Sequence, residues 1–424
     1  MSSHTKCRAL PQLLALGLVL GLALLGGGGD GAGSGSALYA NPALLTRLFR
    51  DGTPVSALSS SASASASASA GVPVFERARP ALTVSTFIGG GLTNQRIRLR
   101  QFLVLAAVKR LAVYLPEASP SREVFIREYN DPAKVGWHRL PFGEVFDAPR
   151  LTACMASLGV EVLGVCGAPV NCSTADTEVN STPLLDLMRS EMVLGAPQGH
   201  VLLTGAPIFD QRSEDAFVAD AVDECISYAP QLRLAAAQVW SAFLAAWRPR
   251  PGGGGGGGSG AGSTADLTTV GVHVRLEDDG AAYFGRGEMS TTLYRAAMLD
   301  RVAHCVRSHV PAGRAAPEAL ALYVASGEPL SSMGGLADEF PRISSKDSLA
   351  PPALGAIAHL FADAAAGVDH LVLLEADFFF GYYESTFSLQ VANERFRRGR
   401  PSALHNAPWQ NPAVCVRHQP FRNW

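Results

Sequence analysis

Three ionisable side chains alternate with apolar ones in the segment from residue 270 to 277. His273, Arg275 and Glu277 stand at every second position between three valines and a leucine. A period of two is typical of a β-strand, so the three polar side chains would share one face. Ionisable groups gathered where a strand ends can bind a charged ligand, although an edge strand with a solvated face would show the same pattern.

A glycine-rich turn near residue 90 offers a second group of polar atoms. Gly90 and Gly91, with a further glycine before them, separate an expected strand at 82–88 from an expected helix at 94–111. Glycines allow backbone amides at a helix start to approach a ligand closely, and Asn94 would stand beside them. Taken alone, the pattern is equally compatible with a tight turn that starts a helix.

A third group of polar residues lies in the last quarter of the chain. The apolar run at 370–374 is interpreted as a strand, and Asp377 follows it before a glycine turn. Ser385 and Thr386 then precede a helix expected at 387–398. Hydroxyl groups and free backbone N–H groups at a helix start are suited to binding a phosphate, although serine and threonine are also ordinary N-caps.

The elements expected around these groups alternate between strands and helices. In the first half we expect strands at 82–88 and 112–116 and helices at 94–111 and 232–247. In the second half we expect strands at 269–277, 320–325 and 370–374 and helices at 291–309, 353–366 and 387–398. This alternation predicts an α/β fold with mainly parallel, doubly wound sheets in two Rossmann-like lobes.

Composition limits the kind of partner. The chain has 424 residues, of which 47% are hydrophobic and 17% charged, so it can form two ordinary domains. The formal net charge of −2 argues against nucleic acid as a partner, since many basic groups are needed to neutralise phosphates.

The N-terminal part predicts passage into the secretory pathway. An apolar run at 9–25 follows two basic residues, which favours a single-pass signal-anchor in the Golgi or endoplasmic reticulum membrane, with a cleaved signal peptide as the alternative. The membrane would be contacted through this segment only. The expected domain boundaries are 1–28 for this segment, 29–79 for a disordered Gly/Ser/Ala stem, 80–250 for the first lobe, 251–264 for a Gly-rich linker or loop, and 265–424 for the second lobe.

Cysteine usage agrees with a luminal body. Of seven cysteines, one precedes the apolar run, and the other six are compatible with three disulfides in any of 15 pairings. No Cys/His spacing typical of structural zinc occurs.

Taken in this order, the polar segments resemble the O-fucosyltransferase family of glycosyltransferases. The resemblance covers roughly residues 84–396. Its motifs are Gly-Gly-Leu-x-Asn-Gln-Arg at 90–96, His-x-Arg-x-Glu-x-Asp at 273–279, Ala-Ser-Gly at 325–327, and Asp-x-Phe-x-Gly…Ser-Thr-Phe-Ser at 377–388 with Val391 and Arg395. Phe142, Phe146 and Asp147 resemble a further Phe-Asp segment of the family.

The resemblance implies a GT-B fold, in which two Rossmann-like lobes face each other across a donor cleft. The C-terminal lobe would hold GDP-fucose, and fucose would pass with inversion to a hydroxyl of a protein or glycan, without a metal or other cofactor. Arg275 would contact the donor diphosphate, His273 the nucleotide, and Asp377 the guanine. The phosphates and base would also meet Ser385, Thr386 and Phe387.

The first lobe would supply the sugar-facing side of this site. Asn94, with Gly90 and Gly91, would face the sugar and the acceptor, and Asn94 and Arg275 would be the catalytic residues. The glycine turn carries no carboxylate, so the base would be Glu277 or Asp278, or the reaction would be dissociative.

Three other functions remain open at this stage. The same fold could use another nucleotide sugar such as UDP-rhamnose. The acidic turn at 277–279 could instead be the metal motif of a GT-A transferase. The chain could also be a catalytically inactive protein that binds a nucleotide sugar.

Overall fold

A computed structural model describes most of the chain's second, larger part. The described residues are 81–84, 91–116, 140–166, 177–180, 200–204, 216–247, 267–277, 280–281, 289–314, 316–357, 360, 362–408, 410 and 413–419. All of them lie in one compact unit, Val74–Trp424. The predicted anchor, the stem, Gly90 and the Gly-rich segment at 251–264 fall outside them. No helix within these ranges is long and apolar enough to cross a bilayer.

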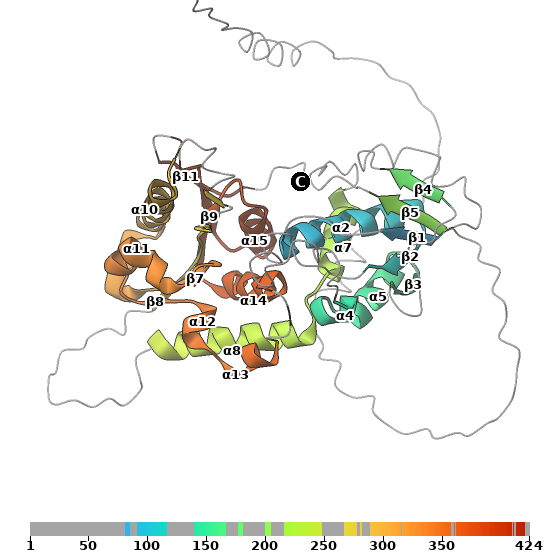
Figure 1. Cartoon of the computed structure of the whole chain (residues 1–424), viewed down its shortest axis with the longest axis horizontal. Helices are drawn as coiled ribbons and strands as arrows, with labels where there is room; N and C mark the ends of the chain where they lie inside the picture. The colour runs from blue at the N-terminus through green and yellow to red at the C-terminus, as the bar shows by residue number, and fades with distance from the viewer. Residues whose placement is uncertain are drawn as a thin grey trace, which may run out of the picture. The chain divides into compact units, whose positions relative to one another are not determined.

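The first half forms a five-stranded parallel sheet in the order β3-β2-β1-β5-β4. Its strands are β1 (Ala81–Val84), β2 (Ala112–Leu115), β3 (Val162–Val165), β4 (Thr177–Asn180) and β5 (His200–Thr204). The helices of this half are α2 (Leu92–Lys109), α4 (Phe142–Val145), α5 (Ala148–Ser157) and α7 (Ala216–Cys225) (Figure 1). The predicted strand–helix–strand unit at the start of the body is therefore confirmed.

The second half forms a six-stranded sheet in the order β11-β10-β9-β6-β7-β8, parallel except for the β10–β11 pair. Its strands are β6 (Thr268–His273), β7 (Leu320–Ala325), β8 (Ile343–Ser344), β9 (Phe378–Tyr382), β10 (Ser402–His405) and β11 (Cys415–Arg417). The helices are α8 (Pro230–Trp247), α10 (Thr291–His309), α11 (Gly334–Glu339), α12 (Lys346–Leu349), α13 (Pro352–Ala356), α14 (Ala362–Glu375) and α15 (Thr386–Arg397), with short 3-10 turns at Ala312–Arg314, Pro317–Ala319 and Leu330–Met333. The α/β fold class is confirmed.

Two predictions for the segment before β9 are wrong. The run at 370–374, predicted as a strand, is the last part of α14, and the strand follows at Phe378–Tyr382. The helix predicted at 353–366 is likewise divided between α13 and α14. Short apolar runs do not separate a buried strand from a buried helix, and here the alanine-rich stretch before residue 370 extends the helix through the run.

Helix α8 packs with the second sheet, although it precedes the expected lobe boundary at residue 250. The Phe243 ring meets the Tyr323 ring of β7 edge-on, with centroids 5.8 Å apart. Trp247 Nε1 donates a hydrogen bond of 3.0 Å to Ser344 Oγ of β8. Figure 1 accordingly shows α8 beside α12 and α13. The chain thus contributes to the second sheet's packing before it reaches the Gly-rich segment.

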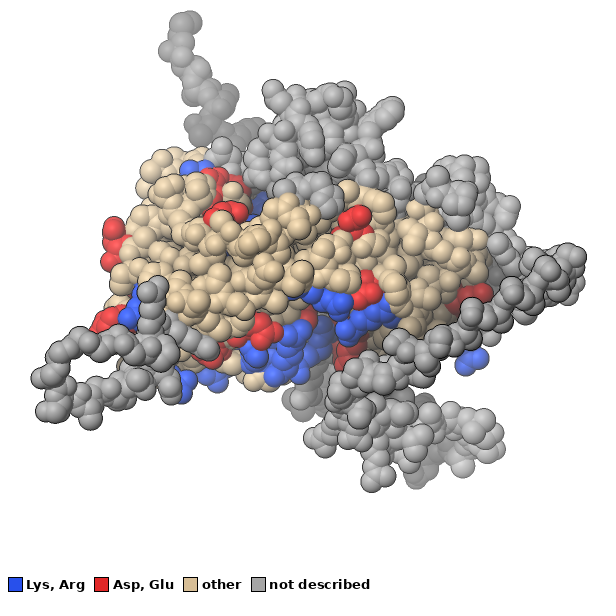
Figure 2. All heavy atoms as spheres, turned by 90° about the horizontal axis from the view of Figure 1, so that it is seen from below, with Lys and Arg blue, Asp and Glu red and all other residues tan. Residues whose placement is uncertain are grey.

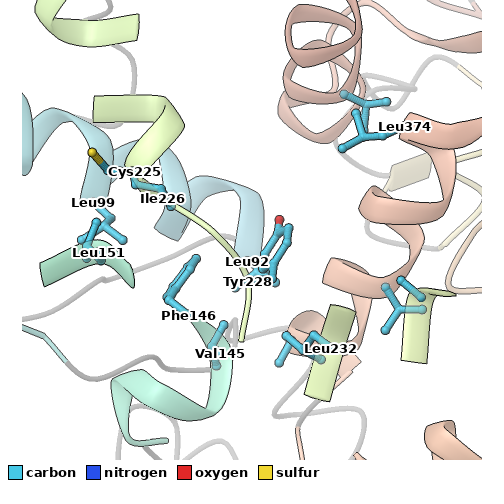
Figure 3. Close-up of a cluster of buried hydrophobic side chains, with 14 of the residues drawn as sticks. Leu92, Leu99, Val145, Phe146, Leu151, Cys225, Ile226, Tyr228, Leu232 and Leu374 are labelled. Carbon is cyan, nitrogen blue, oxygen red and sulfur yellow. The ribbon is translucent and has the colours of Figure 1, made fainter. Parts of the chain in front are cut away.

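One hydrophobic core contains residues from helices of both halves. It includes Leu92 and Leu99 of α2, Phe146, Tyr228, and Leu374 of α14 (Figure 3). A second core lies between α10 and the second sheet. On the face shown in Figure 2, Lys and Arg side chains gather in one group with Asp and Glu beside them, within a larger uncharged surface. Burial of apolar area by these cores is the main source of stability.

Disulfides are present, as the cysteine count predicts. Cys154 of α5 is bonded to Cys225 of α7, and Cys305 of α10 to Cys415 of β11. Cys166 is also disulfide-bonded. The bridges reinforce packing within each half.

Arg395, a residue of the last motif, is wholly buried and makes structural contacts. Its guanidinium donates six hydrogen bonds, five to backbone carbonyls around the end of α14 and the start of β10 and one to a side-chain hydroxyl. The acceptors are the carbonyls of Leu373, Leu374, Ala376, Asp377 and Pro401 and the Oγ of Ser402. Arg395 therefore joins three segments from the interior.

Candidate functional site

His273 is the last residue of β6, which ends four residues before the predicted end at 277, so Arg275 and Glu277 follow the strand and do not lie on it. Its Nδ1 lies 2.7 Å from Ser388 Oγ, and that oxygen also accepts a hydrogen bond of 2.9 Å from the Tyr382 amide. The Phe387 ring lies 4.6 Å from the imidazole, centroid to centroid. Burial, with the charge of Arg275 as a second cause, lowers the pKa of His273 to about 3. The imidazole is therefore neutral at physiological pH and fixed in orientation.

Arg275 follows two residues later at the same edge of the sheet. Its side chain is 35% exposed, and its Nε lies 3.5 Å from Glu277 Oε2. Glu277 Oε1 in turn accepts a hydrogen bond of 2.7 Å from the Gly327 amide, just beyond β7. A Cβ at position 327 would meet this carboxylate, so a larger residue there would require the Glu277 side chain to move. Glu277 therefore joins two strand ends, and the guanidinium of Arg275 beside it is partly accessible.

The acidic turn was the basis for a metal-dependent alternative. Within the described ranges, no group of three His, Cys, Asp or Glu side chains could hold a metal ion. Asp278 and Asp279 lie outside these ranges. The carboxylate that the structure does describe, Glu277, is engaged by a backbone amide.

The start of α15 lies directly against His273. Ser385 is the N-cap, with its Oγ 3.5 Å from the Ser388 amide, and Thr386 and Phe387 form the first helical positions. The strand before them must have a glycine at 381, because a Cβ there would lie 2.6 Å from Ser388 Oγ. Free amides of the first turn give this helix start a partial positive charge. The N-cap interpretation is confirmed, and it is compatible with anion binding.

Asn94 lies in the first turn of α2. The helix begins after Gly91, whose backbone is extended. The Asn94 amide donates a hydrogen bond of 2.9 Å to the Gly91 carbonyl. Its side-chain Oδ1 is buried and has no hydrogen-bond partner among the residues that the structure describes. A buried amide oxygen without a partner is an acceptor for a ligand hydroxyl.

Sequence reasoning missed the buried charges between α2 and the second sheet's helices. Arg96 Nη1 lies 3.0 Å from Glu394 Oε2, and His370 Nε2 lies 3.0 Å from the same oxygen. Burial would lower the pKa of Arg96, but Glu394, Tyr228 and Asp223 together outweigh burial and raise it. Burial likewise opposes ionisation of Glu394, yet Arg96 and His370 bring its pKa well below the usual range. The pair is ionised although Arg96 is buried and Glu394 is only 16% exposed. An arginine on the buried stripe of α2 was the available signal.

Asp377 stands at the other end of the strands from His273. Its Oδ2 accepts hydrogen bonds of 2.8 Å from both the amide and the Oγ1 of Thr269, near the start of β6. Four residues of strand, about 13 Å, separate Thr269 from His273. The structure therefore does not bring Asp377 together with the other candidate residues, and its contact with a guanine stays a prediction.

Asp377→Asn is expected to lower the free energy of unfolding by about 1–2 kcal/mol, because a neutral amide would replace the carboxylate and weaken the two hydrogen bonds from Thr269. GDP affinity is expected to stay within about twofold of wild type, because Asp377 lies at the other end of the strands from His273. A tenfold change in affinity would correspond to about 1.4 kcal/mol of binding free energy. Urea unfolding and a GDP titration measure the two quantities separately. A large loss of GDP affinity at unchanged stability would instead support the guanine contact.

Three buried histidines make the free energy of unfolding depend on pH. Burial lowers the pKa of His273 to about 3, that of His405 to about 4, and that of His370 below its ordinary value. An unfolded histidine titrates near pH 6.5, so the unfolded chain binds more protons than the folded chain below that pH. The free energy of unfolding is therefore expected to fall as pH drops from about 6.5 toward 4.

His405→Phe is expected to flatten this slope, because His405 is 1% exposed and stacks on the Tyr382 ring, where a phenyl group fits. Melting temperatures between pH 7.5 and 4.5, for the wild type and the variant, measure the slope. A slope as steep as that of the wild type would show that His405 is not a source of the acid sensitivity.

Comparisons with known proteins give structural likeness only. No family model matches the chain, and no curated protein sequence matches it. The fold resembles crystal structures of POFUT1 in complex with GDP-fucose (15% identity, 78% of this chain and 99% of that chain, TM-score 0.45) and of NodZ alpha-1,6-fucosyltransferase soaked with GDP-fucose (11%, 80% and 99%, 0.44). It also resembles the structure of a point mutant of Arabidopsis thaliana FUT1 in complex with GDP (11%, 77% and 70%, 0.41).

Proposed function

We propose that the chain is a glycosyltransferase that moves fucose from GDP-fucose to a hydroxyl of a protein or glycan, with inversion. One observation carries the proposal. At the carboxyl edge of the second sheet, the neutral His273 contacts the start of α15, and the accessible guanidinium of Arg275 is near enough to His273 to affect its pKa. In parallel α/β sheets this edge is where ligands bind.

The chemistry of these groups fits departure of a nucleoside diphosphate. Negative charge grows on the diphosphate as the bond to the sugar breaks, and fixed donors that meet this charge lower the barrier. Arg275 can offer two parallel N–H groups to phosphate oxygens, and the first-turn amides after Ser385 add a partial positive charge. These groups supply the compensation without a metal, so activity should persist in EDTA.

The neutral His273 contributes orientation rather than charge. Its Nδ1 is engaged by Ser388, so its Nε2 is the atom left to meet the donor. Asn94 Oδ1, which has no partner in the described part of the chain, can accept a hydrogen bond from a sugar or acceptor hydroxyl. Glu277 is bonded to a backbone amide and is a poor base. We therefore favour a dissociative transition state in which the acceptor proton leaves late.

The proposal extends to architecture and compartment. The two α/β halves would be the lobes of a GT-B fold, with GDP-fucose held mainly by the second half. The N-terminal apolar run would place the body in the lumen of the Golgi or endoplasmic reticulum. The disulfides support this, because such bonds form and persist in oxidising compartments.

A thermal-shift series with GDP-fucose, GDP-mannose, UDP-rhamnose and UDP tests donor binding. A ligand that binds only the folded chain at about 100 times its Kd stabilises it by about 2.7 kcal/mol, which raises Tm. We expect shifts with the GDP compounds. If none of them moves Tm, donor binding as proposed is excluded, and a shift with UDP-rhamnose alone would identify the alternative donor.

An inactive nucleotide-sugar-binding protein is the second candidate. The observation in its favour is that residues 89–96 contain no carboxylate. Hydrolysis of GDP-fucose in EDTA, in which water accepts the fucosyl group and GDP is released, separates the two functions. Turnover supports the enzyme, whereas binding without any GDP release supports the inactive protein.

A further inference from the structure

We propose that Arg96, Glu394 and His370 form a positioning cluster that sets the distance between Asn94 and the donor-binding start of α15. The inference rests on the proposed function, since it concerns how the sugar-facing residue of α2 meets the donor. None of the three side chains is proposed to touch the substrate.

Arg96 connects α2 with two other segments, α15 and the stretch that contains Ile226 and Tyr228. It lies two residues after Asn94 and is buried, and its Nη1 is bonded to Glu394 of α15 at 3.0 Å. Its Nη2 donates a hydrogen bond of 3.3 Å to the Ile226 carbonyl, and its guanidinium lies over the Tyr228 ring at 5.6 Å. The turn that carries Asn94 is thereby attached to α15.

His370 continues the connection toward the site. Its Nε2 shares Glu394 Oε2 with Arg96, and its Nδ1 lies 3.3 Å from the Tyr228 hydroxyl. Its ring meets the Phe387 ring edge-on at 6.0 Å, and Phe387 contacts His273 at 4.6 Å. A continuous set of contacts thus runs from α2, through α14, to the donor side of α15.

A second ion cluster fixes the same pair of helices one turn further along. Asp223 of α7 pairs with Arg100 of α2 at 2.8 Å and with Arg397 of α15 at 2.7 Å. Residues three or four apart lie on the same helix face, so Arg96 and Arg100 present one charged face, as do Glu394 and Arg397. Two points of contact determine the rotation of α2 against α15 as well as their distance.

Buried charges determine geometry more sharply than apolar packing does. A buried ion pair is seldom better for stability than apolar residues of the same volume, but it tolerates few alternative arrangements because an unpaired buried charge is strongly unfavourable. A displacement of about 1 Å at reacting groups can lower a rate about 100-fold. The cluster would therefore contribute mainly to the turnover rate.

Glu394→Gln tests the positioning role, because it keeps the shape of the side chain and removes its charge. We expect kcat for GDP release from GDP-fucose to fall about 10- to 100-fold while the KM for GDP-fucose changes less than about threefold. The matched control is Arg398→Gln, since Arg398 binds the other oxygen of Glu394 at 2.6 Å from the exposed side and leaves the buried contacts in place. The control should keep the wild-type kcat.

The double variant Arg96→Met/Glu394→Met separates positioning from stability. Well-packed apolar side chains can replace a buried pair, so its Tm is expected to return to within a few degrees of wild type while kcat stays low. Recovery of kcat together with Tm would show that the cluster is only structural, as would a wild-type kcat in folded Glu394→Gln. A wild-type chain that shows no GDP-fucose shift, or binds without turnover, overturns the proposed function and the inference with it.

Discussion

Replacing Arg275 by alanine is expected to lower the rate of GDP release from GDP-fucose by about 10²–10³-fold. Arg275 is an accessible cation at the carboxyl edge of the second sheet. In the proposed function it would meet the diphosphate where charge develops as the sugar leaves. Its ion pair with Glu277 is long, at 3.5 Å, and its side chain is 35% exposed. Loss of the guanidinium removes a transition-state contact, and kcat should fall more than donor affinity.

Two further variants test whether geometry or charge alone matters. Arg275→Lys keeps a positive charge but loses the planar pair of donors, so it should recover only part of the rate. Arg307→Ala is the control, since Arg307 lies on the neighbouring α10 in an exposed pair with Glu339 at 2.6 Å and should not affect turnover. Equal turnover by wild type and Arg275→Ala would mean that Arg275 is not the diphosphate contact.

The alternation around β6 allowed the strand to be predicted, because a period of two is local, but the strand ends at His273 and not at 277. The four apolar positions from Val270 to Leu276 are buried, and His273 lies where expected. The same local reasoning failed at 370–374, where an apolar run is compatible with either kind of element. That error also reversed the expected position of Asp377, because a residue after a strand and a residue before one lie at opposite edges of a sheet.

Contacts between distant segments could not be predicted from local pattern. Arg96 and Glu394 are 298 positions apart, and the sequence alone does not show which carboxylate an arginine on α2 will meet. The pattern does show that Arg96 lies on the same helix face as Leu92 and Leu99, and both are buried. A charge on a buried stripe predicts a buried partner without identifying it.

Arg395 is a motif residue whose contacts are structural. It belongs to the same motif as Ser385, yet its side chain is 0% exposed and binds backbone carbonyls. Carbonyls at a helix end have no partners within the helix, so Arg395 takes the place that water would have on a surface. Burial is the first cause of the fall in the pKa of Arg395 to about 10, so the group still carries its charge at neutral pH.

Arg395→Met is therefore expected to lower the free energy of unfolding by about 3–5 kcal/mol. Methionine fills much of the volume but offers no donor, so the carbonyls at the end of α14 lose their shared partner in a region closed to water. Urea titrations measure the loss in the free energy of unfolding, and the melting temperature gives a second, independent measurement. Arg398→Met provides the comparison three positions along α15, where the side chain is 42% exposed and its removal should change stability by about 1 kcal/mol or less.

The size of the difference between these two variants decides what Arg395 does. If the losses are similar, the six hydrogen bonds add little beyond a surface ion pair, and apolar packing holds α14, β10 and α15 together. If the Arg395 variant loses several times more, the link between the end of α14 and β10 depends on one cation. Arg395→Lys then separates charge from donor number, because an ammonium group can supply three of the six hydrogen bonds. An intermediate loss in that variant would show that the number of satisfied carbonyls, rather than the buried charge itself, stabilises this part of the fold.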